Sequence, residues 1–277
     1  MHFQDGIRKP AVSGMFYPKD PLRLRGTIED LLGFQAQSQS QPRSQDRPLP
    51  KILIAPHAGY RYSGAVAASA FVQVAGRGTA FKTVLLLGPS HHFDFEGLAS
   101  CSALAYETPL GEIPLDREGM ARLEADAAVR CFDAAHVPEH SLEVELPFLQ
   151  VAIGDFSLLP LVTGRSSPET VGRVLDRFLG DTKVLIVIST DLSHFHGYSH
   201  ARELDARTCA AIEGLEEESL SPDRACGHVA LAGCLHAARK HRLTVRTLDL
   251  RNSGDVTGER DRVVGYGAWA IYQPVSN

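Results

Sequence analysis

Residues 184–194 read VLIVISTDLSH, a continuous apolar run followed at once by polar residues. Five β-branched or leucine residues in a row, without alternation, are typical of a strand that is covered on both faces. Similar apolar runs predict further strands at residues 52–55, 83–87, 158–162, 247–250 and 263–272. These segments predict a buried sheet at the centre of the molecule.

Between the predicted strands, apolar residues recur at the spacing of a helix. Residues 204–215 place their apolar residues on one face of an amphipathic helix, and residues 64–74 predict a second helix. Strands that are covered on both faces and separated by helices predict an α/β fold with three layers, an α/β/α sandwich. We expect a mixed, largely parallel central sheet, because the carboxy-terminal strands follow closely on one another.

The composition is that of an ordinary globular chain. Its 277 residues are 44% hydrophobic and 22% charged, which is enough for one substantial core and predicts a single domain over residues 1–277. Residues 35–50, QAQSQSQPRSQDRPLP, have almost nothing apolar to bury. We therefore expect a flexible surface insert there.

The charge, the length of the apolar runs, the amino-terminal residues and the cysteines indicate which partners and which location to expect. The formal net charge is −5 and no basic stripe is present, which disfavours nucleic acid and favours a small molecule or a protein. No apolar run approaches the ~20 residues of a membrane-spanning helix, and the amino-terminal MHFQDGIRKP lacks the apolar region of a secretory signal. Five scattered cysteines predict a cytoplasmic protein with reduced thiols.

Histidines follow the ends of three predicted strands. His57 comes after the first strand, His91 after the second, and Asp191 and His194 belong to the segment quoted above. A single histidine after a strand is more often a hydrogen-bonded surface or core residue than a ligand. Because the carboxyl ends of parallel strands meet at one edge of the sheet, the coincidence favours a shared site.

Three further residues are expected at this site. The segment EHS at 139–141 places His140 on the pocket wall, where it would contact substrate, and Tyr60 is expected to turn its ring toward substrate. Cys226 precedes a predicted helix at 229–241, whose dipole favours a thiolate. A packing role for the tyrosine and a buried, inert cysteine are the alternatives. We expect the remaining histidines of the strand ends and helices at the surface, namely His92, His136, His196, His200, His236 and His241.

Two imidazoles and one sulfur make a metal site with three protein ligands. His57, His91 and Cys226 would leave coordination positions for water, substrate or dioxygen, which indicates catalysis. Their wide spacing in the sequence matches no compact metal motif. Asp191 and His194 would supply proton transfer, since the unperturbed pKa of histidine lies closest to neutral.

Several longer motifs occur together in this chain. They are RKPAVSGMFYP (8–18), ILIAPHAGYRYSGAVAA (52–68), LLLGPSHH (85–92), YETPLG (106–111), EHSLEVELPFLQ (139–150), VISTDLSH (187–194), ACGH (225–228) and VVGYGAWAIY (263–272). In this order they closely resemble the Memo family, whose eukaryotic member was named as a mediator of receptor-driven cell motility. The family is similar in fold to the class III extradiol dioxygenases, non-haem iron enzymes that open catechol-type rings. The resemblance thus implies the same three-layer core.

The resemblance also implies roles for single residues. His57, His91 and Cys226 match the metal ligands, and Asp191 and His194 match the SxDxxH element, in which the histidine holds the acid/base position. The dioxygenases use a carboxylate where this chain has Cys226. A soft thiolate suits iron, copper or zinc, so ring opening does not follow from the fold. Kinship with microbial members implies a radical S-adenosylmethionine protein as a partner.

Three functional hypotheses follow. The first is a metal-dependent oxidoreductase of dioxygenase-like type that uses Fe(II) and dioxygen on a small substrate such as a phenol. The second is a non-enzymatic protein that holds a metal or a partner's peptide in the same pocket. The third is a zinc hydrolase, in which the metal activates water and His194 moves the proton. A serine hydrolase of the α/β type is disfavoured, because no GxSxG motif is present.

Overall fold

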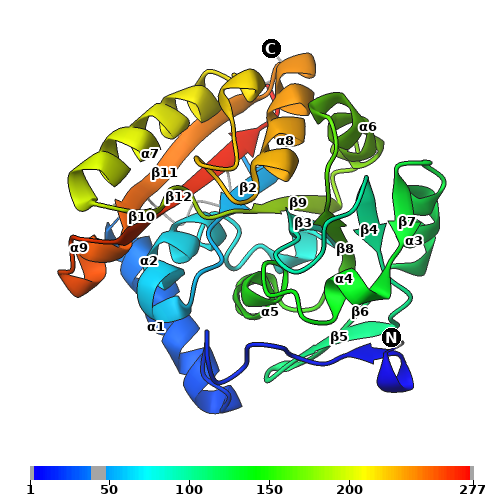
Figure 1. Ribbon diagram of the computed structural model, residues 1–277. Helices are drawn as coiled ribbons and strands as arrows, with labels where there is room; N and C mark the ends of the chain where they lie inside the picture. The colour runs from blue at the N-terminus through cyan, green and yellow to red at the C-terminus, as the bar shows by residue number, and fades with distance from the viewer. Residues whose placement is uncertain (1–2, 39–47, 275–277) are drawn as a thin grey trace.

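The computed structural model describes residues 3–38 and 48–274 and has a mixed central sheet (Figure 1). In spatial order its strands are β10 (His194–His196), β12 (Val263–Tyr272), β2 (Ile52–Ala55), β9 (Val184–Ser189), β3 (Thr83–Pro89), β8 (Ser157–Thr163), β4 (Leu98–Ser100) and β7 (Val129–Cys131), with β11 (Thr244–Asn252) also paired to β12. Strands β2, β9, β3 and β8 are mutually parallel. Strand β12 runs antiparallel to β2, β10 and β11, as the closely spaced carboxy-terminal strands predicted.

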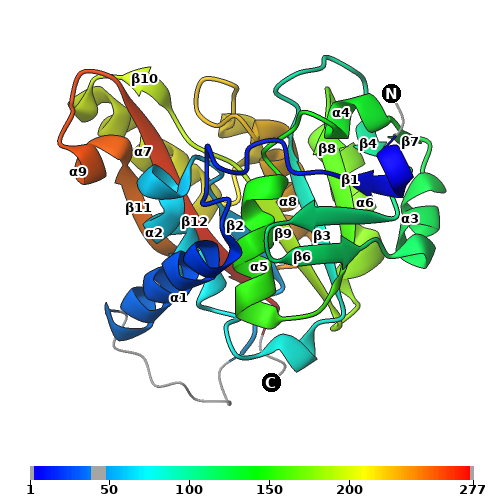
Figure 2. The same cartoon turned by 90° about the horizontal axis from the view of Figure 1, so that it is seen from below.

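Helices cover both faces of this sheet. The face seen in Figure 2 carries α1 (Pro21–Ser38), α2 (Tyr60–Phe71) and α5 (Leu146–Ile153), and the opposite face carries α6 (Pro168–Leu179), α7 (Tyr198–Glu213) and α8 (His228–Lys240). The short elements are η1 (Gln4–Gly6), η2 (Gly78–Ala80), α3 (Arg117–Glu124), α4 (Asp133–His136), η3 (Glu143–Glu145), η4 (Glu217–Ser219) and α9 (Ser253–Thr257). The three-layer α/β arrangement agrees with the prediction.

A second, small sheet lies beside α5. It consists of β1 (Ile7–Arg8), β5 (Ala105–Thr108) and β6 (Gly111–Pro114), with β1 parallel and β6 antiparallel to β5. Its strands are two to four residues long. The apolar runs of the sequence did not predict this sheet, because such short strands carry too few residues to form a pattern.

The main strands and the helices predicted at 204–215 and 229–241 occur close to where the sequence predicted them, and two other predicted segments have different bounds. The helix predicted at 64–74 begins at Tyr60, directly after Gly59, and ends at Phe71. The insert predicted at 35–50 is wrong at its start, because α1 continues to Ser38. Gln35 is buried there and donates from Nε2 to the carbonyl of Ala65 at 2.9 Å, so its amide nitrogen has a partner inside the protein. Residues 39–47 of the insert lie outside the described residues.

None of the helices within residues 3–38 and 48–274 combines the length and apolar character needed to cross a membrane.

His136 is fully buried, so its predicted place at the surface is wrong. Its ring lies between the Tyr106 hydroxyl, 2.6 Å from Nδ1, and the carbonyl of Ala99, 2.9 Å from Nε2. A carbonyl only accepts, so Nε2 carries the proton and Nδ1 accepts from Tyr106. Both ring nitrogens are therefore satisfied without a charge.

This environment predicts a pH dependence of stability. Burial lowers the pKa of His136 to about 4, whereas the unfolded chain titrates near 6.5. Between these values the unfolded state binds the proton and the folded state does not, so stabilisation is complete above about pH 6.5 and is lost as the pH falls toward 4. Between pH 7 and pH 4.5, we expect the unfolding free energy of His136→Gln to fall less than that of the wild type, by up to about 3 kcal/mol. Urea titrations at the two pH values measure this difference. Parallel curves for the two proteins would contradict this.

Candidate metal centre

The predicted site residues meet at the carboxyl edge of the parallel strands. His57 lies two residues beyond the end of β2, and His91 two residues beyond the end of β3. Strand β9 lies between these strands and ends at Ser189. Cys226 reaches the same edge from the loop before α8. Four separate segments of the chain thus converge on one place, as the parallel arrangement predicted.

His57, His91 and Cys226, here called the ligand triad, bring their donor atoms together. One nitrogen of each histidine and the Cys226 sulfur all lie within 4.8 Å of one another. The Cys226 Sγ is 3.3 Å from Nε2 of His57, and the two imidazole rings are 5.2 Å apart between centroids. The His57 ring is buried, whereas the His91 side chain is 28% exposed. The triad is therefore open to solvent on the His91 side.

Hydrogen bonds fix both sides of His57. Its Nδ1 lies 2.7 Å from the Ser189 hydroxyl, which leaves Nε2 toward the Cys226 sulfur. Its backbone N–H donates to the Asp191 carboxylate at 2.9 Å. Burial, together with the neighbouring His91 and His140, lowers the pKa of His57 well below its ordinary value. The imidazole is therefore neutral at pH 7, the form in which histidine binds metals.

Cys226 lies next to the start of α8, as predicted, but the helix does not make it a thiolate by itself. Gly227 is the N-cap and the helix begins at His228. Burial and the nearby Asp191 raise the pKa of the Cys226 thiol to about 12, which corrects the expectation from the helix dipole. The Asp191 backbone N–H donates to the sulfur at 3.3 Å. A bound cation would favour the thiolate at this position.

His91 is held by Glu139, whose importance the sequence did not reveal. The carboxylate accepts the His91 backbone N–H at 2.7 Å and lies 2.9 Å from the His91 Nδ1. Burial opposes ionisation of Glu139, yet the hydrogen bonds from His91 and Ser141 outweigh it and hold its pKa well below the usual range. With Nδ1 engaged, Nε2 is the nitrogen of His91 that would bind a metal. Carboxylate-bound histidines of this kind are typical of metal sites.

His140 stands at the wall of the site, as expected. Its ring stacks on His91 with 4.5 Å between centroids and meets His57 edge-on at 5.5 Å. Burial and the neighbouring His91 lower the pKa of His140 to about 4. His91, Glu139 and His140 form a second group whose donor atoms lie within 4.8 Å of one another. This second group shares His91 with the ligand triad and is the alternative place for an ion.

His194 lies beside the triad on a distorted strand. It belongs to β10, where a bulge at Phe195 with φ 62° interrupts the pairing with β12. Burial, and to a lesser degree His91, lowers the pKa of the half-buried His194 ring. His194 is thus neutral at pH 7, and a positive charge on His91 would oppose its protonation.

Asp191 and Tyr60 both contact other parts of the chain. Asp191 is buried, its carboxylate accepts the His57 backbone N–H, and burial raises its pKa to about 7. Tyr60 packs between the rings of Tyr17 and Phe148 and donates its hydroxyl to the carbonyl of Val144 at 2.8 Å. The substrate-facing role of Tyr60 stays a prediction, and this placement favours packing. The proton-transfer role of Asp191 also stays a prediction, and its hydrogen bond to His57 adds a part in positioning that residue.

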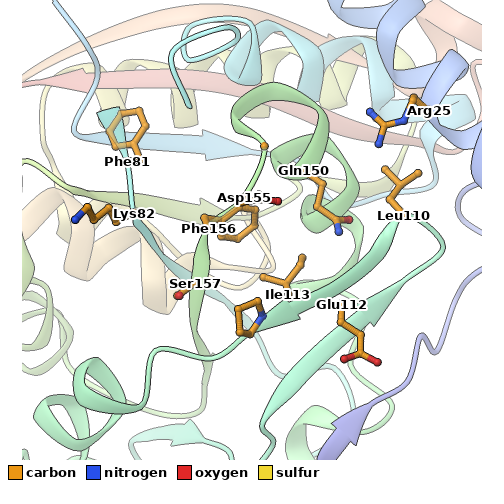
Figure 3. Close-up of a pocket in the computed structure, with 12 residues that line it drawn as sticks. Arg25, Phe81, Lys82, Leu110, Glu112, Ile113, Gln150, Asp155, Phe156 and Ser157 are labelled. Carbon is orange, nitrogen blue, oxygen red and sulfur yellow. The ribbon is translucent and has the colours of Figure 1, made fainter. Parts of the chain in front are cut away.

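Two other features lie outside this site. Glu169, Glu217 and His236 form a third donor group, but Arg239 already neutralises Glu217 with a hydrogen bond of 2.7 Å. A cavity of about 610 Å³ opens at the opposite end of the parallel strands from the triad, where β8 begins (Figure 3). Gln150 of α5, Ile113 of β6 and the segment before β8 form its walls. It is therefore separate from the histidines.

Comparison with known proteins agrees with these motifs. Residues 8–270 match the family of Memo-like proteins. The chain belongs to the Memo family. A MEMO1 family protein of Methanopyrus kandleri is 34% identical over 279 residues, covering 94% of this chain and 97% of its own. The MEMO1 family proteins of Aquifex aeolicus and Aeropyrum pernix are 34% and 35% identical, over 94% and 95% of this chain and 97% and 98% of theirs. Membership of the Memo family thus extends over nearly the whole chain.

Proposed function

We propose that the protein is a metal-dependent oxidoreductase of dioxygenase-like type that holds Fe(II) on His57, His91 and Cys226 and acts on a small substrate such as a phenol. The observation that carries the proposal is the convergence of two imidazoles and one sulfur within 4.8 Å. This donor set suits iron, and copper and zinc also accept it. We further propose that the fold is of the class III extradiol dioxygenase type, which agrees with the three layers.

Three ligands with one partly exposed side support an open, catalytic site over a closed, structural one. Fe(II) bound there would supply one-electron chemistry with dioxygen. The chain itself supplies the groups that handle the substrate. His194 is neutral and half-buried, so it is suited to accept a proton from a phenol hydroxyl. His140 presents a neutral ring on the wall, where it would donate a hydrogen bond to the substrate.

Substitution of His194 tests the division between binding and chemistry. We expect His194→Ala to keep its Fe(II) and to lose about 10²- to 10⁴-fold in the rate of oxygen uptake with a panel of catechols, because it removes only a proton acceptor. His196→Ala, on the same short strand, is the matched control and should keep the rate. Metal content is measured by mass spectrometry after anaerobic purification.

The outcomes separate the three hypotheses. Iron retention with oxygen-dependent turnover supports the proposal. Preferential zinc retention with ester or amide hydrolysis and no oxygen uptake would replace it with the hydrolase. Metal retention without any turnover would favour a binding protein. Metal loss in His194→Ala equal to that in His57→Ala would make His194 a ligand.

A further inference from the structure

The Ser189 hydroxyl, at the end of β9, is surrounded by three polar groups. Its Oγ lies 2.7 Å from Nδ1 of His57, 2.7 Å from the carbonyl of Ser141 and 2.8 Å from Oε1 of Glu145. Ser141, Ser189 and Glu145 are fully buried. All three distances are those of good hydrogen bonds, so each contact needs one proton.

The source of each proton follows from the chemistry of the groups. The Ser141 carbonyl has no proton to give, so the single proton of Ser189 goes to it. The two lone pairs of Oγ are then free to accept two donors. His57 must donate from Nδ1, and Glu145 must donate as a carboxylic acid. If Glu145 were ionised, Ser189 and His57 would supply only two protons for the three contacts. One of the three pairs of contacting atoms would then have no hydrogen between them.

We propose that Glu145 is a positioning residue, a neutral carboxylic acid that completes the hydrogen bonds of Ser189 and so holds the His57 ring with its proton on Nδ1. The Nε2 lone pair of His57 is thereby left facing the Cys226 sulfur and any ion beside it. This inference rests on the proposed metal site for its purpose, but the proton arrangement itself does not need a metal.

The surroundings of Glu145 support a neutral acid. Its second oxygen, Oε2, is buried and has no hydrogen-bond partner among the described residues. Burying an ionised carboxylate with an unpartnered oxygen costs far more than burying the carbonyl of a neutral acid. Burial and the nearby Asp191 raise the pKa of Glu145 well above its ordinary value, and only the hydrogen bond with Ser189 opposes this.

The arrangement affects metal binding through the choice of tautomer. A histidine with its proton on Nε2 presents an N–H, not a lone pair, to the position between His57 and Cys226. Groups that fix a ligating histidine in this way typically change metal affinity 10- to 100-fold when they are removed. Ser189 is therefore expected to matter for affinity although it is not a ligand.

Nitrogen NMR on metal-free protein with ¹⁵N-labelled histidine tests the tautomer. We expect His57 in the wild type to carry its proton on Nδ1. In Ser189→Ala the acceptor of that proton is lost, and we expect the Nε2–H form to become the major one and Fe(II) affinity to fall 10- to 100-fold. Ser100→Ala is the matched control, because Ser100 is equally buried but its hydroxyl donates to Glu124 instead.

Infrared spectroscopy tests the neutral acid directly. In the difference spectrum between wild type and Glu145→Gln at pH 7, we expect the carbonyl band of a protonated carboxylic acid, shifted by ¹³C-labelled glutamate. Because the glutamine amide also donates, Glu145→Gln should keep the Nδ1–H form of His57 and an Fe(II) affinity within about threefold of the wild type.

Two results would overturn the inference: a carboxylate band for Glu145 at pH 7, or an Nε2–H form of His57 in the metal-free wild type. A correct tautomer and acid band in a protein that binds no metal would leave the inference standing and would refute the proposed function. The two failures are therefore distinguishable.

Discussion

Replacing His57 with alanine should abolish stoichiometric Fe(II) binding while the protein stays folded. Its Nε2 is 3.3 Å from the Cys226 sulfur, so the substitution removes the buried one of two imidazoles from the ligand triad. We expect affinity to fall by more than the 10- to 100-fold that is typical for a group that only supports a ligand. Anaerobic titration calorimetry with Fe(II) measures this loss.

The fold should survive because the strand before His57 is held independently of it. Strand β2 is fully buried and is hydrogen-bonded to β9 on one side and to β12 on the other. His92→Ala is the matched control, because His92 is exposed and adjoins a ligand without belonging to the triad. Wild-type Fe(II) affinity in His57→Ala, with a normal circular dichroism spectrum, would remove His57 from the site.

Replacing Glu143 with glutamine should have the largest effect on stability. The fully buried carboxylate forms an ion pair with Arg8, which is also buried, and accepts the backbone N–H groups of Ala11 and Val12 and the hydroxyl of Tyr17. Removing the charge leaves the Arg8 guanidinium buried without its negatively charged partner. Such a loss costs about 3–5 kcal/mol, which urea denaturation measures as a drop in unfolding free energy.

The control is an ion pair in the same part of the chain that water can reach. Lys9 and Glu107 form a pair with side chains 58% and 31% exposed, so water screens the pair and Glu107→Gln should leave the unfolding free energy nearly unchanged. Equal effects of the two substitutions would show that burial of Arg8 does not decide the outcome.

The sequence predicted the central sheet well because burial on both faces leaves a continuous apolar run. Residues 184–188 and 52–55 are such runs, and both are strands whose residues are all buried. The start of α2 was less predictable. Gly59 provides no side-chain cap, and the first turn, Tyr60 to Ser63, is not a strong apolar pattern. Strands of three residues, such as β4 and β7, have too few positions to show a period.

The ligand triad was predictable from topology, but the residues that support it were not. His57 and His91 each follow a strand, and parallel strands bring such residues to one edge. Glu139, Glu143 and Glu145 are acidic residues, which are usually found at a solvent-exposed surface, yet all three are buried. Each satisfies a partner distant in the sequence. His136 was misplaced for the same reason, since Tyr106 and Ala99 provide its hydrogen bonds.

The charge state of Cys226 was also outside the reach of the sequence. Its place before α8 was predictable, but the balance between the helix dipole and burial depends on the surrounding packing. Burial prevails and raises the pKa of the thiol.

Anomalous diffraction at the iron edge, from a crystal loaded anaerobically with Fe(II), tests the central claim most directly. The ligand triad predicts a single peak within bonding distance, about 2.0–2.3 Å, of one nitrogen of His57, one nitrogen of His91 and the sulfur of Cys226. A peak bound by Glu139 and His140 with Cys226 left aside, or no peak at the carboxyl edge of the sheet, would contradict the account.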